Sequence, residues 1–84
     1  MKNEFSNASN KEIEEFYKKI SRNVKLLREN HNLTQLDLAL DIGIKSVAFY
    51  SNCENNRYNK HFNLEHLYKI SKSLQIDLCD LVKQ

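Results

Sequence analysis

The sequence predicts an all-α bundle of five helices with an extended N-terminal helix. Apolar residues recur at spacings of three and four along most of the chain, and residues typical of helix caps precede several of these segments. There is no proline, and no segment alternates apolar and polar residues as a strand does. A chain of 84 residues supports one domain. We expect this domain over residues 11–84, after a flexible tail over residues 1–10.

The first and longest helix is expected from Lys11 to Asn30. Ser9 and Glu12 have the spacing of a capping box, and a continuous apolar stripe follows them: Ile13, Phe16, Tyr17, Ile20, Val24 and Leu27. The first three of these side chains need a burial site. They could pack on the fifth helix or against a second copy of the chain. We favour packing within the chain, because a small domain gains most by covering its own core.

The second helix is expected from Leu33 and Thr34 to about Ile42, with Leu36 and Leu40 flanking its inner face. Gly43 is the only glycine, and it should take a positive φ in the turn that follows. A third helix should run from near Ser46 to about Glu54. Two short helices joined by such a turn form a helix-turn-helix, which can place one helix in a DNA groove.

The last third of the chain predicts a polar loop and two more helices. The loop covers residues 55–63, and the fourth helix is marked by Leu64, Leu67, Ile70, Ser71 and Leu74. Asp77 should cap a short fifth helix whose inward side chains are Leu78, Leu81 and Val82.

Composition excludes several classes of protein. The chain is 40% hydrophobic, too apolar for a disordered protein, yet no apolar run approaches the roughly 18 residues of a membrane span. No export signal is recognisable, so we expect a cytoplasmic protein with no membrane partner. Cys53 and Cys79 lack a CxxC spacing and should be free thiols. Without a metal-binding pattern or a glycine-rich phosphate loop, we expect no metal, no cofactor and no enzymatic activity.

The net charge of +2 is modest, but it is unevenly distributed. Basic and acidic side chains balance in residues 1–41. Residues 42–72 carry five basic side chains against Glu54 and Glu65, namely Lys45, Arg57, Lys60, Lys69 and Lys72. This excess is typical of a surface that faces phosphates.

From Ile20 to Val82 the chain resembles the phage-repressor/Cro-type, or XRE, family of helix-turn-helix domains. The residues that carry the resemblance are Val24, Leu27, Arg28, the LTQ of residues 33–35, Leu38, Ala39, Ile42-Gly43-Ile44, Glu54 and the segment of residues 64–81. The resemblance implies a repressor-like bundle and an ion pair between Arg28 and Glu54. It also implies that Gln35 binds a phosphate and that the loop after the third helix follows the DNA backbone.

The third helix departs from the family pattern, because one extra residue separates Gly43 from Glu54. Either the turn is longer and Ser46 caps the helix, which directs Tyr50 and Cys53 inward, or the helix starts at Lys45 and contains a bulge. In the second case Phe49 points inward, and Ser46, Val47 and Tyr50 point outward. We favour the first, because serine is a good cap and cysteine suits a core.

The outward face expected for this helix has few side chains suited to reading bases. Asn52 offers an amide that could pair with adenine, and Val47 and Ala48 could contact thymine methyl groups. Serines and the basic loop could bind phosphates. The predicted DNA contacts are Gln35, Lys45, Ser46, Val47, Ala48, Ser51, Asn52, Asn56, Arg57 and Lys60.

We therefore predict a sequence-specific, repressor-like transcriptional regulator that binds double-stranded DNA as a homodimer. The alternative is a protein-interaction module that uses the apolar part of the third helix, for which a protein partner would be expected. A narrower form of the first hypothesis is an antitoxin or a mobile-element repressor, which a neighbouring toxin or integrase gene would indicate.

Overall fold

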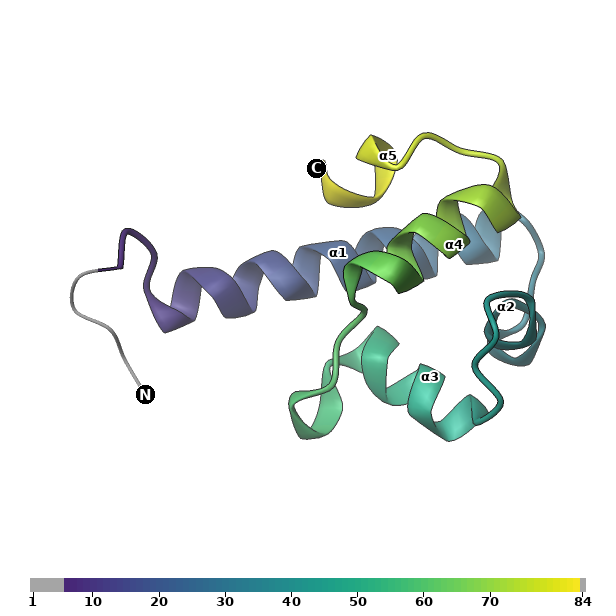
Figure 1. Ribbon diagram of the computed structural model, residues 1–84, viewed down its shortest axis with the longest axis horizontal. Helices are drawn as coiled ribbons and strands as arrows, with labels where there is room; N and C mark the ends of the chain where they lie inside the picture. The colour runs from purple at the N-terminus through teal and green to yellow at the C-terminus, as the bar shows by residue number, and fades with distance from the viewer. Residues whose placement is uncertain (1–5, 84) are drawn as a thin grey trace.

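The computed structural model describes residues 6–83, which form five α-helices and one short 3₁₀ helix (Figure 1). In chain order these are α1 (Asn10–Asn30), α2 (Gln35–Asp41), α3 (Val47–Asn55), η1 (Arg57–Asn59), α4 (Leu64–Leu74) and α5 (Cys79–Val82). No strand occurs among the described residues, which confirms the all-α prediction. Of the predicted tail, residues 1–5 lie outside the described part, and α1 begins at residue 10.

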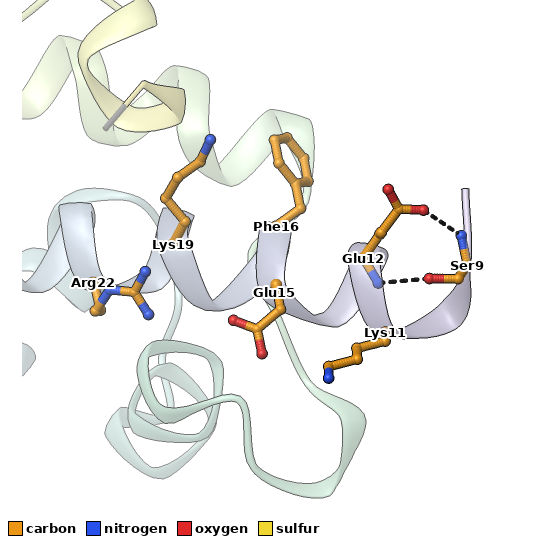
Figure 2. A pocket seen from close by; sticks show the side chains of 7 residues that line it. All are labelled: Ser9, Lys11, Glu12, Glu15, Phe16, Lys19 and Arg22. Atoms are coloured by element: carbon orange, nitrogen blue, oxygen red, sulfur yellow. Dashed lines mark hydrogen bonds between the residues drawn. The ribbon is translucent and has the colours of Figure 1, made fainter. Parts of the chain in front are cut away.

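Side-chain caps fix where the helices begin. At α1 the Ser9 hydroxyl accepts a hydrogen bond from the Glu12 amide at 3.1 Å, and the Glu12 carboxylate accepts one from the Ser9 amide at 2.8 Å (Figure 2). The same reciprocal pair joins Thr34 to Asp37 at α2. Such boxes satisfy amides that have no partner within a helix, so the capping signal in the sequence was read correctly.

Gly43 ends α2 in the conformation that the sequence predicted, with φ of +83°. The Ile44 amide reaches back to the carbonyl of Ala39 at 2.8 Å, which makes the reversal tight. Ile42 and Ile44, on either side of the glycine, are both buried. The turn therefore anchors the chain in the core at both ends before α3 begins.

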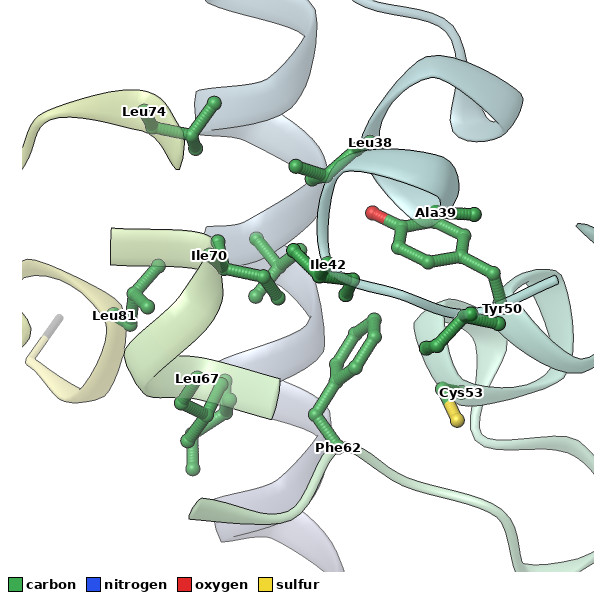
Figure 3. Close-up of a cluster of buried hydrophobic side chains, with 13 residues drawn as sticks. Leu38, Ala39, Ile42, Tyr50, Cys53, Phe62, Leu67, Ile70, Leu74 and Leu81 are labelled. Carbon is green, nitrogen blue, oxygen red and sulfur yellow. The ribbon is translucent and has the colours of Figure 1, made fainter. Parts of the chain in front are cut away.

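The core gathers side chains from all five α-helices (Figure 3). Its fully buried members are Val24, Leu38, Ala39, Tyr50, Cys53, Ile70 and Leu81. The ring of Phe62 lies 5.3 Å from that of Tyr50, centroid to centroid, so the segment before α4 is also part of this core. Cys53 and Cys79 are free thiols, as expected.

Three apolar residues were predicted on the wrong face. Leu36 and Leu40 are 48% and 58% exposed, because the inward stripe of α2 consists of Leu38, Ala39 and Ile42. A side chain two positions from this stripe points to the opposite side of the helix. Leu78 is also exposed, since it lies before α5 rather than on its inner face. Leu81 is buried and Val82 packs against the core, as predicted, and the Asp77 side chain accepts from the Cys79 amide at 3.1 Å.

The first two turns of α1 extend beyond the bundle, and the prediction that they pack on α5 is wrong (Figure 1). Ile13 and Phe16 are 43% and 47% exposed. Tyr17 does have a partner, but that partner is the loop residue His61. The two rings are stacked, with their centroids 3.7 Å apart. The α5 segment packs further along α1, where Asn23 donates to the Leu81 carbonyl at 3.0 Å.

Substitution of Gly43 should destabilise the fold through backbone strain. A methyl group there would meet only the tip of Lys69, at 3.9 Å, so steric conflict is not the cause. We expect Gly43→Ala to lower the free energy of unfolding by about 1 kcal/mol, and Gly43→Asn by less, because asparagine tolerates positive φ better. Urea unfolding measures both, with Lys45→Ala in the same turn as the control. Equal stability of the alanine variant and the parent would contradict this explanation.

Candidate nucleic-acid interface

The extra residue between Gly43 and Glu54 is accommodated in the turn. Ser46 is the N-cap of α3, and its hydroxyl accepts from the Phe49 amide at 3.1 Å. The helix then runs without interruption from Val47 to Asn55. Tyr50 and Cys53 are fully buried, so the longer turn is confirmed and the bulged alternative is wrong.

One face of α3 points away from the core. Val47 and Ala48 are exposed on its first turn, and Ser51 and Asn52 follow on the same face, partly buried. Ser46 and Lys45 lie exposed just before the helix. The structure thus brings the DNA contacts predicted for residues 45–52 together on one surface.

Asn55 was expected in the loop and was not among the predicted DNA contacts. In the structure Asn55 is the last residue of α3, and its amide donates to the Ser51 carbonyl at 2.9 Å. It therefore continues the outward face that starts at Val47, since residues four apart share a side of a helix. This places a second carboxamide on the surface that presents Asn52.

A buried carboxylate, Glu54, holds α3 in place. Arg28 binds it in a bidentate manner, with Nε 2.9 Å from Oε2 and Nη2 3.1 Å from Oε1. The Tyr50 hydroxyl donates to Oε2 at 2.8 Å, and the Gln35 amide donates to Oε1 at 2.9 Å. The ion pair implied by the resemblance is therefore present, and it links α1, α2 and α3.

These donors determine the charge state of Glu54. Burial by itself would raise the pKa of its carboxyl group. The hydrogen bonds from Arg28, Gln35 and Tyr50, together with the positive charge of Arg28, outweigh burial and hold the pKa below its usual value of 4.5. Burial and the nearby carboxylate raise the pKa of Tyr50. At neutral pH the site is a carboxylate that accepts from a phenol, an amide and a guanidinium.

Two of the predicted phosphate contacts have internal partners. The Gln35 amide is turned to Glu54, as described above. Asn56 takes a left-handed conformation, with φ of 53°, and its amide donates to the Ser21 hydroxyl of α1 at 3.2 Å. Arg57 and Lys60 are exposed in the loop that follows. The structure therefore gives Gln35 and Asn56 structural contacts and leaves the basic side chains at the surface.

Basic residues of α1 border the same region and were missed in the sequence. A shallow hollow of about 300 Å³ is lined by Lys18, Ser21, Arg22, Lys25, Glu54, Asn55 and Asn56. Lys18 and Lys25 thus flank the end of α3, although both are far from it in the chain. The charge distribution along the sequence did not indicate these lysines, because acidic residues of the same helix balance them.

No group of three His, Cys, Asp or Glu side chains among residues 6–83 could hold a metal ion. No described helix has the length and apolar character required to cross a membrane.

Comparison with known families agrees with this architecture. A family model described as "Helix-turn-helix" matches residues 24–81, which extend from the middle of α1 to α5. No curated protein and no solved structure matches the chain.

The Glu54 cluster should dominate stability and give it a defined pH dependence. We expect Glu54→Gln to cost about 3 kcal/mol at pH 7, because the buried Arg28 loses its counter-charge. Tyr50→Phe should cost about 1 kcal/mol, the contribution of one hydrogen bond.

A carboxyl group whose pKa is lowered by folding stabilises the protein above its unfolded pKa. That contribution disappears as the pH falls through the lower, folded value. The gap in unfolding free energy between the parent and Glu54→Gln should therefore be constant above about pH 5 and shrink below 4.5. Urea titrations over this pH series measure it, and a gap that does not change with pH would refute the assignment.

Proposed function

Because the chain belongs to the XRE-type helix-turn-helix family of DNA-binding regulators, we propose that it represses transcription by binding a specific DNA sequence as a homodimer. The observation that carries the proposal is the outward face of α3, which points away from the core on a helix that the hydrogen bonds of Glu54 anchor. In this proposal α3 enters the major groove. We also propose that it acts in the cytoplasm.

Base recognition is assigned to the outward face of α3. The Asn52 carboxamide can donate to and accept from one adenine edge, and Asn55 can act similarly at the end of the helix. The methyl groups of Val47 and Ala48 suit thymine, whose methyl group faces the major groove. Ser46 and Ser51 supply hydroxyl groups for a phosphate or a base edge. This set favours A·T-containing half-sites over G·C-rich ones, because it contains no arginine for guanine.

Phosphate binding is assigned to the basic side chains that surround α3. Lys45 precedes the helix, Arg57 and Lys60 follow it, and Lys18 and Lys25 border its C-terminal end. Gln35 stays a proposed phosphate ligand, but its amide would have to leave Glu54 to serve as one. Asn56 is proposed to contribute mainly by holding the loop against α1.

A homodimer provides the specificity that one α3 lacks. Few side chains on this face make bidentate contacts, and each such pair contributes roughly 1–3 kcal/mol of discrimination. Two copies on half-sites about 34 Å apart would read twice as many bases. Selection from random duplexes should therefore recover a palindrome.

Substitutions should separate recognition from general affinity. We expect Asn52→Ala to weaken binding to the selected site by about tenfold or more and to leave binding to random duplex unchanged, because it removes a base contact. Lys60→Ala should weaken binding to the selected site and to random duplex alike. It should also reduce the slope of log K against the logarithm of the salt concentration by about 0.9. Lys72→Ala is the control, because Lys72 of α4 borders a hollow formed with the end of α2 and Gly43, which no α3 residue lines. No measurable affinity of the parent for random duplex at low salt would refute DNA binding and favour a protein partner.

The lysines of α1 should contribute to affinity without contributing to specificity. Lys25→Ala is expected to reduce the salt slope by about as much as Lys60→Ala, because each loses one phosphate contact. The preferred sequence should not change. If the Lys25→Ala variant has the same salt slope as the parent and as Lys72→Ala, then α1 does not contact DNA as proposed.

A further inference from the structure

A second surface lies mainly on the projecting half of α1, and at Arg22 it meets the hollow beside the end of α3. A shallow groove of about 550 Å³ runs along this half and is lined by Ser9, Lys11, Glu12, Glu15, Phe16, Lys19 and Arg22 (Figure 2). We refer to these residues as the α1 face. At its centre the Phe16 ring is about half exposed, and the Lys19 ammonium lies 5.4 Å from the ring centroid. The contacts that bind the rest of α1 to the bundle leave this surface free.

Charges on the α1 face are ordered along the helix. The acidic side chains Glu12 and Glu15 come first, and the basic side chains Lys19 and Arg22 follow after Phe16. When two such helices lie antiparallel about a twofold axis at the level of residue 17, each acidic position meets a basic one. Position 12 then faces 22 of the other helix, and 15 faces 19. The surface is its own electrostatic complement.

Within one copy of the chain the Glu12 carboxylate caps α1 and the Lys19 ammonium lies over Phe16, but these charges form no ion pairs with one another. Among the described residues, no ion pair within 4.0 Å involves Glu15, Lys19 or Arg22. Glu15 and Lys19 are four apart, a spacing that permits a pair within the helix, yet their side chains point apart in Figure 2. Both are therefore available to a partner.

We propose that the α1 face binds the α1 face of a second copy, with the two helices antiparallel. An isologous twofold contact requires a surface that complements itself, and this charge order meets the requirement. Phe16 of each copy lies close to the axis and supplies the apolar centre of the contact. The inference names the dimer surface that the proposed function needs, but it concerns the free protein and can be tested without DNA.

A contact of about four helical turns is small, so the dimer should be weak in solution. Simultaneous binding of two half-sites would strengthen it through effective concentration. This arrangement leaves the first turns of α3 free, because of the residues of the α1 face only Arg22 also borders the hollow at the C-terminal end of α3.

The test is sedimentation equilibrium of the full chain without DNA, at low salt and from about 1 to 500 µM. Dissociation constants in this range are accessible to the method. Glu15→Lys and Lys19→Glu should each weaken the dimer by about tenfold, because each brings like charges together twice in the complex. A mixture of the two variants should form a heterodimer at close to the parent's affinity, and so should the homodimer of the double variant.

A matched control lies one residue away. Glu14→Lys makes the same charge change as Glu15→Lys on the adjacent face, which borders the loop residues Asn56 and His61 rather than the groove. It should leave the dimer unchanged. Phe16→Glu should abolish it while urea unfolding shows a stable fold, because Phe16 contributes little to the core.

A parent chain that stays monomeric at about 500 µM would overturn the proposal. The proposal would also be overturned if Glu14→Lys and Glu15→Lys weakened the dimer equally. The same holds if a mixture of Glu15→Lys and Lys19→Glu failed to associate. These outcomes leave DNA binding untouched, since one copy can still bind random duplex.

Discussion

The carboxylate of Glu54 is the point at which three helices of this protein are joined. It accepts hydrogen bonds from Arg28 of α1, Gln35 of α2 and Tyr50 of its own helix. A buried charge is stable only when its partners are complete, so the cluster requires all three elements to be in place together. The distance and angle between α2 and α3, on which the helix-turn-helix depends, follow from this requirement.

The Glu54 cluster also explains how α3 tolerates an extra residue before it. Tyr50 and Cys53 must point inward together with Glu54, which fixes the rotation of α3 from its C-terminal end. An insertion within the helix would rotate its first turns relative to that end. The turn between Gly43 and Ser46 has no such constraint, so the additional residue lies there and the outward face keeps its alignment.

The fold and the proposed function use different sides of the same helices. The inward sides of α1 and α3 carry the core and the Glu54 cluster. The outward sides carry the asparagines of α3, the lysines next to them and the ordered charges of the α1 face. Because the cluster anchors α3 without using its outward side chains, those side chains are free to vary with the target.

The sequence by itself determined the five helices and where α1 and α2 begin, whereas the end of α3 at Asn55 came only from the structure. Ser9, Thr34 and Gly43 act through hydrogen bonds and backbone angles within a few residues, and such local effects can be read from the order of the chain. Only the tertiary structure decided which apolar residues are buried. Leu36, Leu40 and Phe16 fit an apolar pattern but are exposed, because burial depends on where another helix lies. The same holds for Lys25, which reaches the end of α3 through the packing of α1, a contact between residues distant in the chain.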